Sequence, residues 1–150
     1  MSNITVLIPI RNEIKHIERS VKSALQLTDK VYVIDSYSTD GSIEVAEKLG
    51  AKVFQYEWTA ESNFSAKINW ALENLPIDTT WAFRLDADEY FLENSIACLN
   101  EYVKKIDDDV NGGTIIRRIY FMGKWMKHSG EYPKTSLRLF RVGKVRMESR

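Results

Sequence analysis

The chain has 150 residues, 44% of them hydrophobic, and its 21 basic residues balance 21 acidic ones. This length suits one globular domain, and the balanced charge gives no indication of a nucleic-acid partner. No apolar run approaches the about 20 residues that span a membrane. The single cysteine, Cys98, excludes an internal disulfide and is typical of a reducing cytosol.

The first half of the chain alternates predicted strands with predicted helices. Helical spacing of apolar residues extends from Ile14 to Leu25, and helices are also predicted near 42–49 and 64–75. Asp40 is expected to cap the second helix and Gly50 to end it. Short apolar runs predict the strands, at 5–10, 31–35, 52–56 and 81–85. The alternation predicts βαβ units and a mostly parallel sheet flanked by helices.

The pattern changes after the fourth predicted strand. A further helix carries Ile96 and Ile106, and the acidic run at 107–109 is interpreted as a solvated turn. Strands are predicted over 114–121 and 137–142, with no helix between them. We therefore expect an α/β fold whose C-terminal part extends the sheet in antiparallel fashion.

Polar segments follow three of the predicted strands. Residues 9–13, with the sequence Pro-Ile-Arg-Asn-Glu, follow the first strand, and the polar loop 35–42 follows the second. The sequence Asp-Ala-Asp-Glu at 86–89 follows the fourth. Ligands of open α/β sheets bind beyond the carboxyl ends of the strands. We therefore expect the three segments to share one edge of the sheet and to line one site.

The acidic tip of the fourth strand indicates a metal. Alternate residues of an extended chain point the same way, so Asp86 and Asp88 are predicted to face one ligand. Their oxygens suit Mg²⁺ or Mn²⁺, especially a metal that also holds substrate phosphates. Such a metal would neutralise a diphosphate and improve it as a leaving group. Taken alone, the two acids also fit ordinary strand-end and turn residues.

Other residues near these tips suit the rest of a nucleotide. A carboxylate such as Asp35 can accept a hydrogen bond from the N–H of a uracil base, and Asp86 can hold ribose hydroxyls or the metal. Arg11 and Lys67 are candidate cationic partners for phosphate. Lys67 taken alone also fits a solvated helix residue.

Together these segments resemble the inverting family 2 glycosyltransferases, which have the GT-A fold. The matching elements are residues 9–13, residues 33–42 and the Asp-x-Asp of 86–88. The stretch 64–72 is similar to a family helix that carries an Arg-Asn pair, here Lys67 and Asn69. Residues 123–133 and 138–141 resemble a bacterial subgroup that includes lipopolysaccharide-core β-glucosyl- and heptose-modifying transferases.

The resemblance implies a set of residue roles. Pro9, Arg11 and Glu13 would line the nucleotide pocket, and Asp35 would contact the base. Asp86 would contact the ribose or the metal, and Asp88 would be the principal ligand of Mn²⁺ or Mg²⁺.

The resemblance also implies substrates and location. The donor would be a nucleotide-diphospho-sugar, with a UDP-sugar favoured, and the acceptor a saccharide or a lipid-linked saccharide in cell-surface polysaccharide or lipopolysaccharide synthesis. Transfer would proceed with inversion, in the cytoplasm or at the inner membrane face. Residues 1–150 would form a single GT-A-type domain, with 1–90 as the nucleotide-binding part and 91–150 as the start of the acceptor side.

This sequence departs from the family pattern in three ways. Ser36 stands where many members carry a second acid, and Lys67 replaces the commoner Arg, which forms a bidentate fork that Lys lacks. Family members also continue past the point that corresponds to Arg150, and their catalytic base lies further on. We therefore expect the domain to be incomplete at its C-terminus. Glu131 and His128 are the candidate bases in the acceptor-side region.

Alternative functions remain at this point. The chain could be a nucleotide-sugar-binding module that lacks the base and is inactive as a transferase. A nucleotidyltransferase is disfavoured, because such enzymes carry a Gly-rich loop after the first strand and residues 9–13 contain no Gly. If later elements normally cover the sheet, we expect self-association through 115–121 and 137–142.

Overall fold

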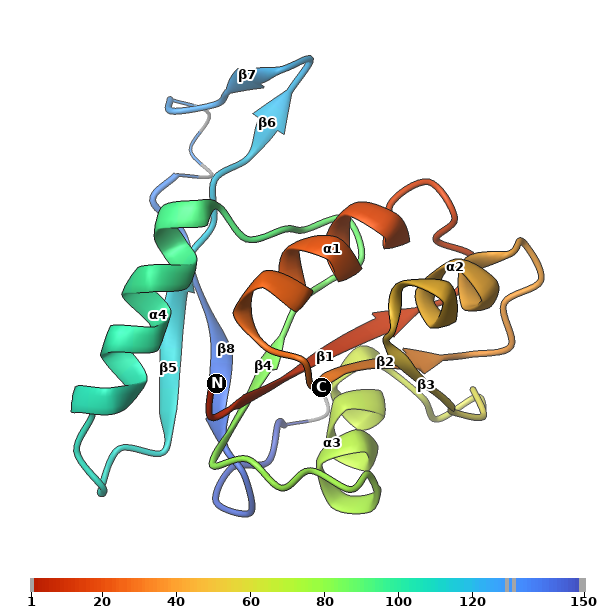
Figure 1. Ribbon diagram of the computed structural model, residues 1–150, viewed down its shortest axis with the longest axis horizontal. Helices are drawn as coiled ribbons and strands as arrows, with labels where there is room; N and C mark the ends of the chain where they lie inside the picture. Colours follow the sequence, from red (N-terminus) through yellow and green to blue (C-terminus); the bar gives the residue numbers. More distant parts are fainter. Residues whose placement is uncertain (1, 129, 131, 149–150) are drawn as a thin grey trace.

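The computed structural model describes residues 2–128, 130 and 132–148, which form a central sheet flanked by helices (Figure 1). The spatial order of the six strands found in this part of the chain is β3 (Lys52–Gln55), β2 (Val31–Asp35), β1 (Ile4–Ile10), β4 (Trp81–Arg84), β8 (Thr135–Arg141) and β5 (Gly112–Ile116). The first four are parallel, and β8 runs antiparallel to both β4 and β5. The predicted parallel sheet with an antiparallel C-terminal extension is confirmed.

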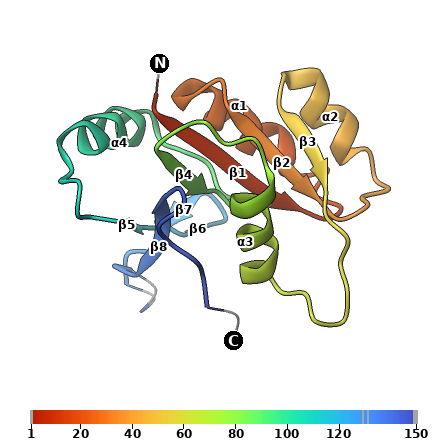
Figure 2. The same cartoon turned by 90° about the horizontal axis from the view of Figure 1, so that it is seen from below.

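The sheet is covered on both faces. Helices α1 (Ile17–Leu27), α2 (Ser42–Leu49) and α4 (Glu93–Lys105) lie on one face, and α3 (Phe64–Asn74) lies on the other (Figure 2). Every residue of β1 is buried, and alternate side chains enter the two cores: Val6 and Ile8 pack on the side of α1, and Leu7 packs on the side of α3. An apolar run with no polar face needs this double cover.

Local signals at the helix ends are partly those expected. Helix α2 ends at Gly50, which has a φ of +100°. The residue at its N-cap position is Gly41, so the prediction of Asp40 as the cap is one residue off. The Asp40 carboxylate still accepts hydrogen bonds from the backbone N–H groups of Ser42 and Ile14, each at 3.0 Å. It therefore joins the start of α2 to the loop after β1.

The strand predicted over 114–121 is wrong in its second half. Strand β5 ends at Ile116, and the chain then forms a separate hairpin of β6 (Tyr120–Phe121) and β7 (Lys124–Trp125), which projects beyond the sheet (Figure 1). Met122 and Gly123 connect its strands with φ values of +48° and +76°. A two-residue turn with both φ angles positive fits the twist of a hairpin, and apolar periodicity alone did not reveal it.

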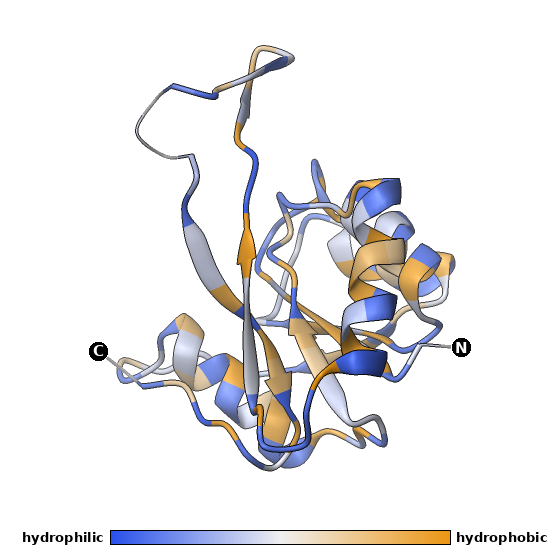
Figure 3. Cartoon of the chain, turned by 90° about the vertical axis from the view of Figure 1, so that its left-hand side faces the viewer, coloured by the Kyte–Doolittle hydropathy of each residue, from blue (hydrophilic) through white to orange (hydrophobic). Residues whose placement is uncertain are grey.

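Apolar side chains are exposed along the edge formed by β5 and the hairpin. Strand β5 has a sheet neighbour on one side only. Exposed side chains on or near it are Ile116, Phe121, Met122 and Leu137, and this arm of the molecule stands apart from the main body in Figure 3. Self-association through this edge stays a prediction. None of the helices in the described part of the chain is long and apolar enough to cross a membrane.

Candidate functional site

The loops after β1 and β2 are bonded to one another. The backbone N–H of Asn12 donates to Ser38 Oγ at 2.7 Å, and the N–H of Glu13 donates to Ser42 Oγ at 2.9 Å. The Asn12 side chain in turn accepts from the N–H of Thr39 at 2.8 Å. The polar segments 9–13 and 35–42 therefore share one edge of the sheet, as predicted from parallel strands.

Asp35 at the end of β2 is fully buried. Its carboxylate accepts hydrogen bonds from Ser38, through the backbone N–H at 2.9 Å and through the hydroxyl. The side chain thus holds the loop that follows it. Each carboxylate oxygen can accept a second hydrogen bond, so Asp35 retains acceptor capacity beyond this structural contact.

Lys67 reaches from α3 to the ends of β1 and β2, with 1% of the residue exposed. Its ammonium donates to the carbonyl oxygen of Ile10 at 2.7 Å and to Ser36 Oγ at 2.8 Å. Burial lowers the pKa of Lys67 to about 8, although the charge of Asp35 opposes this and Arg11 adds to it. Lys67 is therefore not a solvated helix residue, and the Ser at position 36 serves as its acceptor.

A pocket of about 260 Å³ opens beside these groups. Four predicted nucleotide-binding residues and Ile10 share its wall with two aromatic side chains; the full set is Pro9, Ile10, Arg11, Glu13, Trp58, Phe64 and Lys67. Asp35 is not in this wall. The rings of Trp58 and Phe64 meet edge to face with centroids 5.8 Å apart. Phe64 is the first residue of α3, lies at the pocket and is 57% exposed, so it does not belong to the core.

The chain does not stay extended through the Asp-x-Asp segment. The N–H of Glu89 donates to the carbonyl oxygen of Asp86 at 2.9 Å, which closes a turn directly after β4. The premise that Asp86 and Asp88 point the same way along an extended strand is therefore wrong. The two carboxylates have different surroundings.

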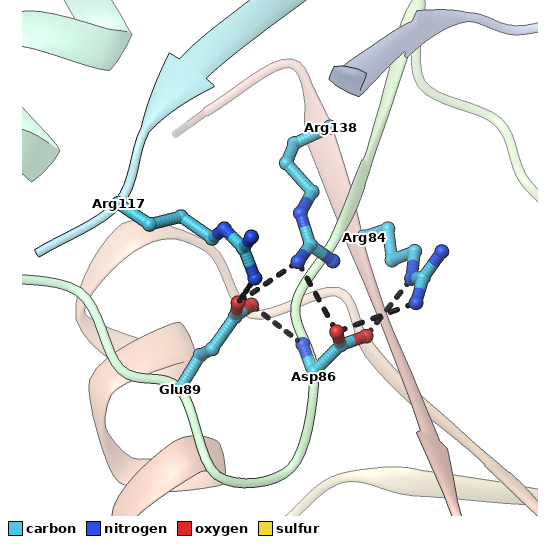
Figure 4. Close-up of polar contacts among 5 residues, drawn as sticks. All are labelled: Arg84, Asp86, Glu89, Arg117 and Arg138. Atoms are coloured by element: carbon cyan, nitrogen blue, oxygen red, sulfur yellow. Dashed lines mark hydrogen bonds and ion pairs between the residues drawn. The ribbon is translucent and has the colours of Figure 1, made fainter. Parts of the chain in front are cut away.

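Asp86 is held by two arginines (Figure 4). Arg84 Nε donates to it at 2.9 Å, and an Nη atom of Arg138 donates at 3.1 Å. Burial raises the pKa of Asp86, but Arg138 and Arg84 together outweigh burial and hold the pKa below its usual value. Asp86 is therefore a charged carboxylate within a fixed ion-pair cluster.

Glu89 is the second acid of this cluster. It accepts from Arg138 at 2.8 Å and from the backbone N–H of Asp86 at 3.0 Å, and Arg117 lies 3.5 Å away. Burial raises the pKa of Glu89 above its usual value, and Arg138 offsets part of that effect. The sequence analysis missed Arg84, Glu89, Arg117 and Arg138. The alternation of Arg84 and Asp86 was a local signal for one pair, but the other arginines come from distant segments.

Arg138 is placed by an irregularity in the sheet. The β5–β8 register pairs Gly113 with Leu139 and Thr114 with Leu137, so Arg138 is the extra residue on β8. Such a bulge redirects a side chain from the normal alternation. Because β8 is antiparallel to β4, the beginning of β8 lies at the carboxyl end of β4, where Arg138 meets Asp86.

Asp88 is exposed, and its carboxylate has no hydrogen-bond or ion-pair partner among the described residues. Its carbonyl oxygen accepts from Arg19 at 3.4 Å. Within the described residues there is no group of three His, Cys, Asp or Glu side chains that could hold a metal. A single free carboxylate nevertheless fits Mg²⁺ or Mn²⁺ when phosphates and waters supply the other ligands.

The two candidate bases are not brought to the site. His128 is exposed in the loop after β7 and does not line the pocket beside β1 and α3. Glu131 lies outside the described residues. Neither residue gains support as the base.

The fold and the strand-end pocket define a GT-A-type nucleotide-sugar transferase architecture. The family described as "Glycosyl transferase family 2" matches residues 5–149. The chain therefore belongs to glycosyl transferase family 2, and its prediction as a family 2 transferase is confirmed at the level of the family.

Curated relatives are also glycosyltransferases. An uncharacterized glycosyltransferase of Rickettsia conorii is 37% identical over 89 residues, which cover 57% of this chain and 29% of that protein. The lipopolysaccharide core biosynthesis glycosyltransferase LpsC of Rhizobium meliloti is 28% identical over 142 residues, which cover 91% of this chain and 50% of that protein. The chain thus spans half or less of the length of these relatives.

Solved structures agree on the fold. TarS 1–349 of S. aureus aligns with 95% of this chain and 47% of its own, with a TM-score of 0.60 and 18% identity. Glucosyl-3-phosphoglycerate synthase of Mycobacterium tuberculosis in complex with UDP aligns with 59% of this chain and 34% of its own, with a TM-score of 0.51 and 25% identity. The predicted GT-A fold is confirmed by these likenesses.

Proposed function

We propose that this chain binds a nucleotide-diphospho-sugar, with a UDP-sugar favoured, and transfers the sugar with inversion to a hydroxyl of an acceptor. The observation that carries the proposal is the pocket beside β1 and α3, which gathers Pro9, Arg11, Glu13 and Lys67. It lies beyond the carboxyl end of β1. This strand has β2 and β3 on one side and β4 on the other, so the strand order changes direction there. Open α/β sheets bind nucleotides at such a switch point.

The lining suits the parts of a nucleotide. The rings of Trp58 and Phe64 offer apolar surface on which a base can stack. Asp35, which pairs with the wall residue Ile10 in the β1–β2 register, would supply a carboxylate for the base N–H once the Ser38 loop adjusts. Arg11 and the ammonium of Lys67 supply positive charge for a diphosphate. The synthase that is 25% identical to this chain was solved with UDP, which supports the choice of nucleotide.

The acids after β4 are proposed to divide the remaining roles. Asp88 has the free carboxylate and would hold Mg²⁺ or Mn²⁺ together with the donor phosphates. When bound, the metal would neutralise charge on the leaving diphosphate. Asp86, already bonded to Arg84 and Arg138, would accept from a ribose hydroxyl with its remaining lone pairs rather than serve as the main metal ligand.

The acceptor is proposed to be a saccharide or a lipid-linked saccharide of a cell-surface polysaccharide or lipopolysaccharide. The named role of LpsC in lipopolysaccharide core biosynthesis supports this proposal. Within it, residues 1–90 form the nucleotide-binding part and 91–150 begin the acceptor side of one domain. A cytoplasmic location, with contact to the inner membrane face, belongs to the same proposal.

A second candidate is a nucleotide-sugar-binding module without transferase activity. The exposure of His128, outside the wall of the donor pocket, favours it, because inverting transfer needs a base beside the acceptor hydroxyl. Measuring donor hydrolysis and sugar transfer beside UDP affinity separates the two. Binding without turnover supports the module, and turnover supports the transferase.

The metal role is tested by calorimetry of UDP with and without Mn²⁺. We expect Mn²⁺ to tighten binding to the wild type and not to Asp88→Asn. The matched control is Asp108→Asn, which removes an equally exposed carboxylate in the turn before β5. Equal responses of both variants to Mn²⁺ would show that Asp88 holds no metal, and failure of the wild type to bind UDP would refute the proposed function.

A further inference from the structure

A second, larger cavity has Asp88 in its wall. Its volume is about 690 Å³, and it is bounded by the segment after β4, the segment after β5 and the start of β8. Its wall contains four arginines and two acids: Arg19, Arg117, Arg118, Arg138, Asp88 and Glu89. We refer to it as the arginine cavity. Of the described residues to which the sequence assigned a nucleotide, metal or base role, Asp88 alone lies in this wall.

The guanidinium groups of this wall are not fully satisfied. Arg138 is 5% exposed, and one of its Nη atoms donates to both Asp86 and Glu89. Its other Nη atom and the Nε of Arg117 are buried and have no hydrogen-bond partner among the described residues. A buried donor without an acceptor destabilises the fold, more so when it is charged. These two donors are covered in the present arrangement, so they represent hydrogen-bonding capacity that a bound anion uses only after the guanidinium groups reorient.

The charge of the wall points to an anion. Among the described residues of the wall, four arginines exceed two acids by two positive charges. Arg19 and Arg118 form no ion pair with those two carboxylates, although Arg19 donates to the backbone carbonyl of Asp88. Their guanidinium groups lie over the rings of Tyr90 and Trp125, at 4.4 Å and 4.3 Å from the centroids. Asp86 lies outside the wall and is shared with Arg84. Positive charge in a concave, low-dielectric site attracts anions more strongly than it does on open surface.

We propose that the arginine cavity binds a carboxylate or phosphate group carried by the acceptor saccharide, with Arg117 and Arg138 as its hydrogen-bond donors. This inference rests on the proposed transferase function and names the chemical class of its acceptor. Arginine suits both anions, because its planar fork matches two of their oxygens at once.

The position of Asp88 connects this cavity to the donor. Asp88 is the proposed metal ligand and also lies in the wall of the arginine cavity, so an acceptor held there would lie near the carboxylate that would hold the metal. The donor pocket has its own cations, Arg11 and Lys67, and shares no wall residue with the arginine cavity. Two separate cationic sites fit two charged substrates better than one.

The test compares three probes of similar size, glucose 6-phosphate, glucuronate and glucose, by calorimetry. We expect the two charged sugars to bind the wild type and glucose to bind at least tenfold more weakly. Arg117→Gln should weaken both charged probes about tenfold, since a hydrogen bond to a charged group contributes about 1.5–3 kcal/mol. Arg146→Gln removes the same charge from an exposed pair with Glu73 and should leave the affinities unchanged. Arg118→Gln is a second variant. Because the Arg118 side chain is exposed, a loss of affinity in this variant is not explained by misfolding.

Two results overturn the proposal. Binding of glucose as tight as that of the charged sugars would show that the cavity does not select an anion. Loss of UDP affinity in Arg117→Gln, equal to the loss of charged-sugar affinity, would assign the cavity to the donor. A wild type that binds the charged sugars but not UDP would refute the donor proposal while the anion site stands, so the two failures are distinguishable.

Discussion

The parallel half of the molecule and its antiparallel extension hold their polar groups in different ways. At the ends of β1 and β2, carboxylates bind backbone and hydroxyl groups, mostly close in sequence: Asp35 binds Ser38, and Asp40 binds Ser42 as well as the more distant Ile14. At the junction with β8, the acids bind guanidinium groups, and the bonds of Arg138 span 52 and 49 residues. The first arrangement forms with the local loops, whereas the second exists only after the extension has docked on β4.

The largest expected effect concerns the buried ion-pair cluster. Arg138→Leu removes the shared partner of Asp86 and Glu89 and should lower the free energy of unfolding by about 3 kcal/mol, because it leaves two partly buried acids with fewer partners. Denaturation by urea measures the change. Arg146→Leu, which breaks an exposed pair with Glu73, should change stability by no more than about 0.5 kcal/mol. Equal losses in both variants would contradict a special role for the junction.

The next effect concerns the aromatic wall of the donor pocket. Phe64→Ala should weaken UDP binding about tenfold, since stacking of a base on an aromatic ring contributes about 1–3 kcal/mol. Stability should stay within about 0.5 kcal/mol of the wild type, because Phe64 is already exposed. Met122→Ala, which truncates an exposed side chain on the distant hairpin, is the control for calorimetry. An unchanged affinity for UDP in Phe64→Ala would remove the stacking role.

A smaller effect is expected at the open edge of the extension. Phe121→Lys should weaken self-association about fivefold, because partial burial of a Phe side chain contributes about 1 kcal/mol. Sedimentation velocity over a concentration series measures it, and Tyr102→Lys on α4 is a control at another exposed aromatic. A wild type that remains monomeric at the highest concentration refutes self-association.

The smallest effect is a pH dependence of donor binding. Lys67 has a pKa lowered to about 8 by burial, with Asp35 opposing and Arg11 adding to the shift. Its ammonium is therefore charged at pH 7 and mostly neutral at pH 8.5, so UDP affinity should fall about fourfold over that interval if the charge contacts phosphate. Lys67→Arg stays charged and should lose less UDP affinity over the same interval. Calorimetry at pH 7 and pH 8.5 measures the UDP affinity of both proteins. Equal pH profiles would show that the charge of Lys67 does not contribute to UDP binding.

Lys67 also makes the free energy of unfolding depend on pH, and the direction of this dependence follows from its lowered pKa. Between about pH 8 and its ordinary value of 10.5, the unfolded chain binds the proton more tightly than the folded chain does. The contribution of Lys67 to the free energy of unfolding therefore rises with pH across that window. Comparing urea denaturation of the wild type and Lys67→Met from pH 7 to pH 10 isolates this contribution. A difference that stays flat over this range would contradict the lowered pKa.

Local sequence patterns predicted most of the strands and helices of the parallel half. Strand β2 and helix α2 have the predicted bounds, and Gly50 ends α2 as expected, because apolar periodicity and a left-handed glycine are properties of a few adjacent residues. The same holds for the shared edge of segments 9–13 and 35–42, which follows from parallel strand direction. That edge and α3 together form the pocket, whose wall includes Pro9, Arg11, Glu13 and Lys67.

The sequence by itself thus determined the fold class, the family and the edge of the sheet where a nucleotide is proposed to bind. Only the tertiary structure decided that Asp86 is bonded to Arg84 and Arg138 while Asp88 stays free, because the turn after β4 and the bulge at Arg138 depend on pairing with β8. It also decided that four arginines surround one cavity. Charges that meet across about fifty residues leave no periodic signal, since their contact is a product of sheet topology rather than of neighbouring sequence.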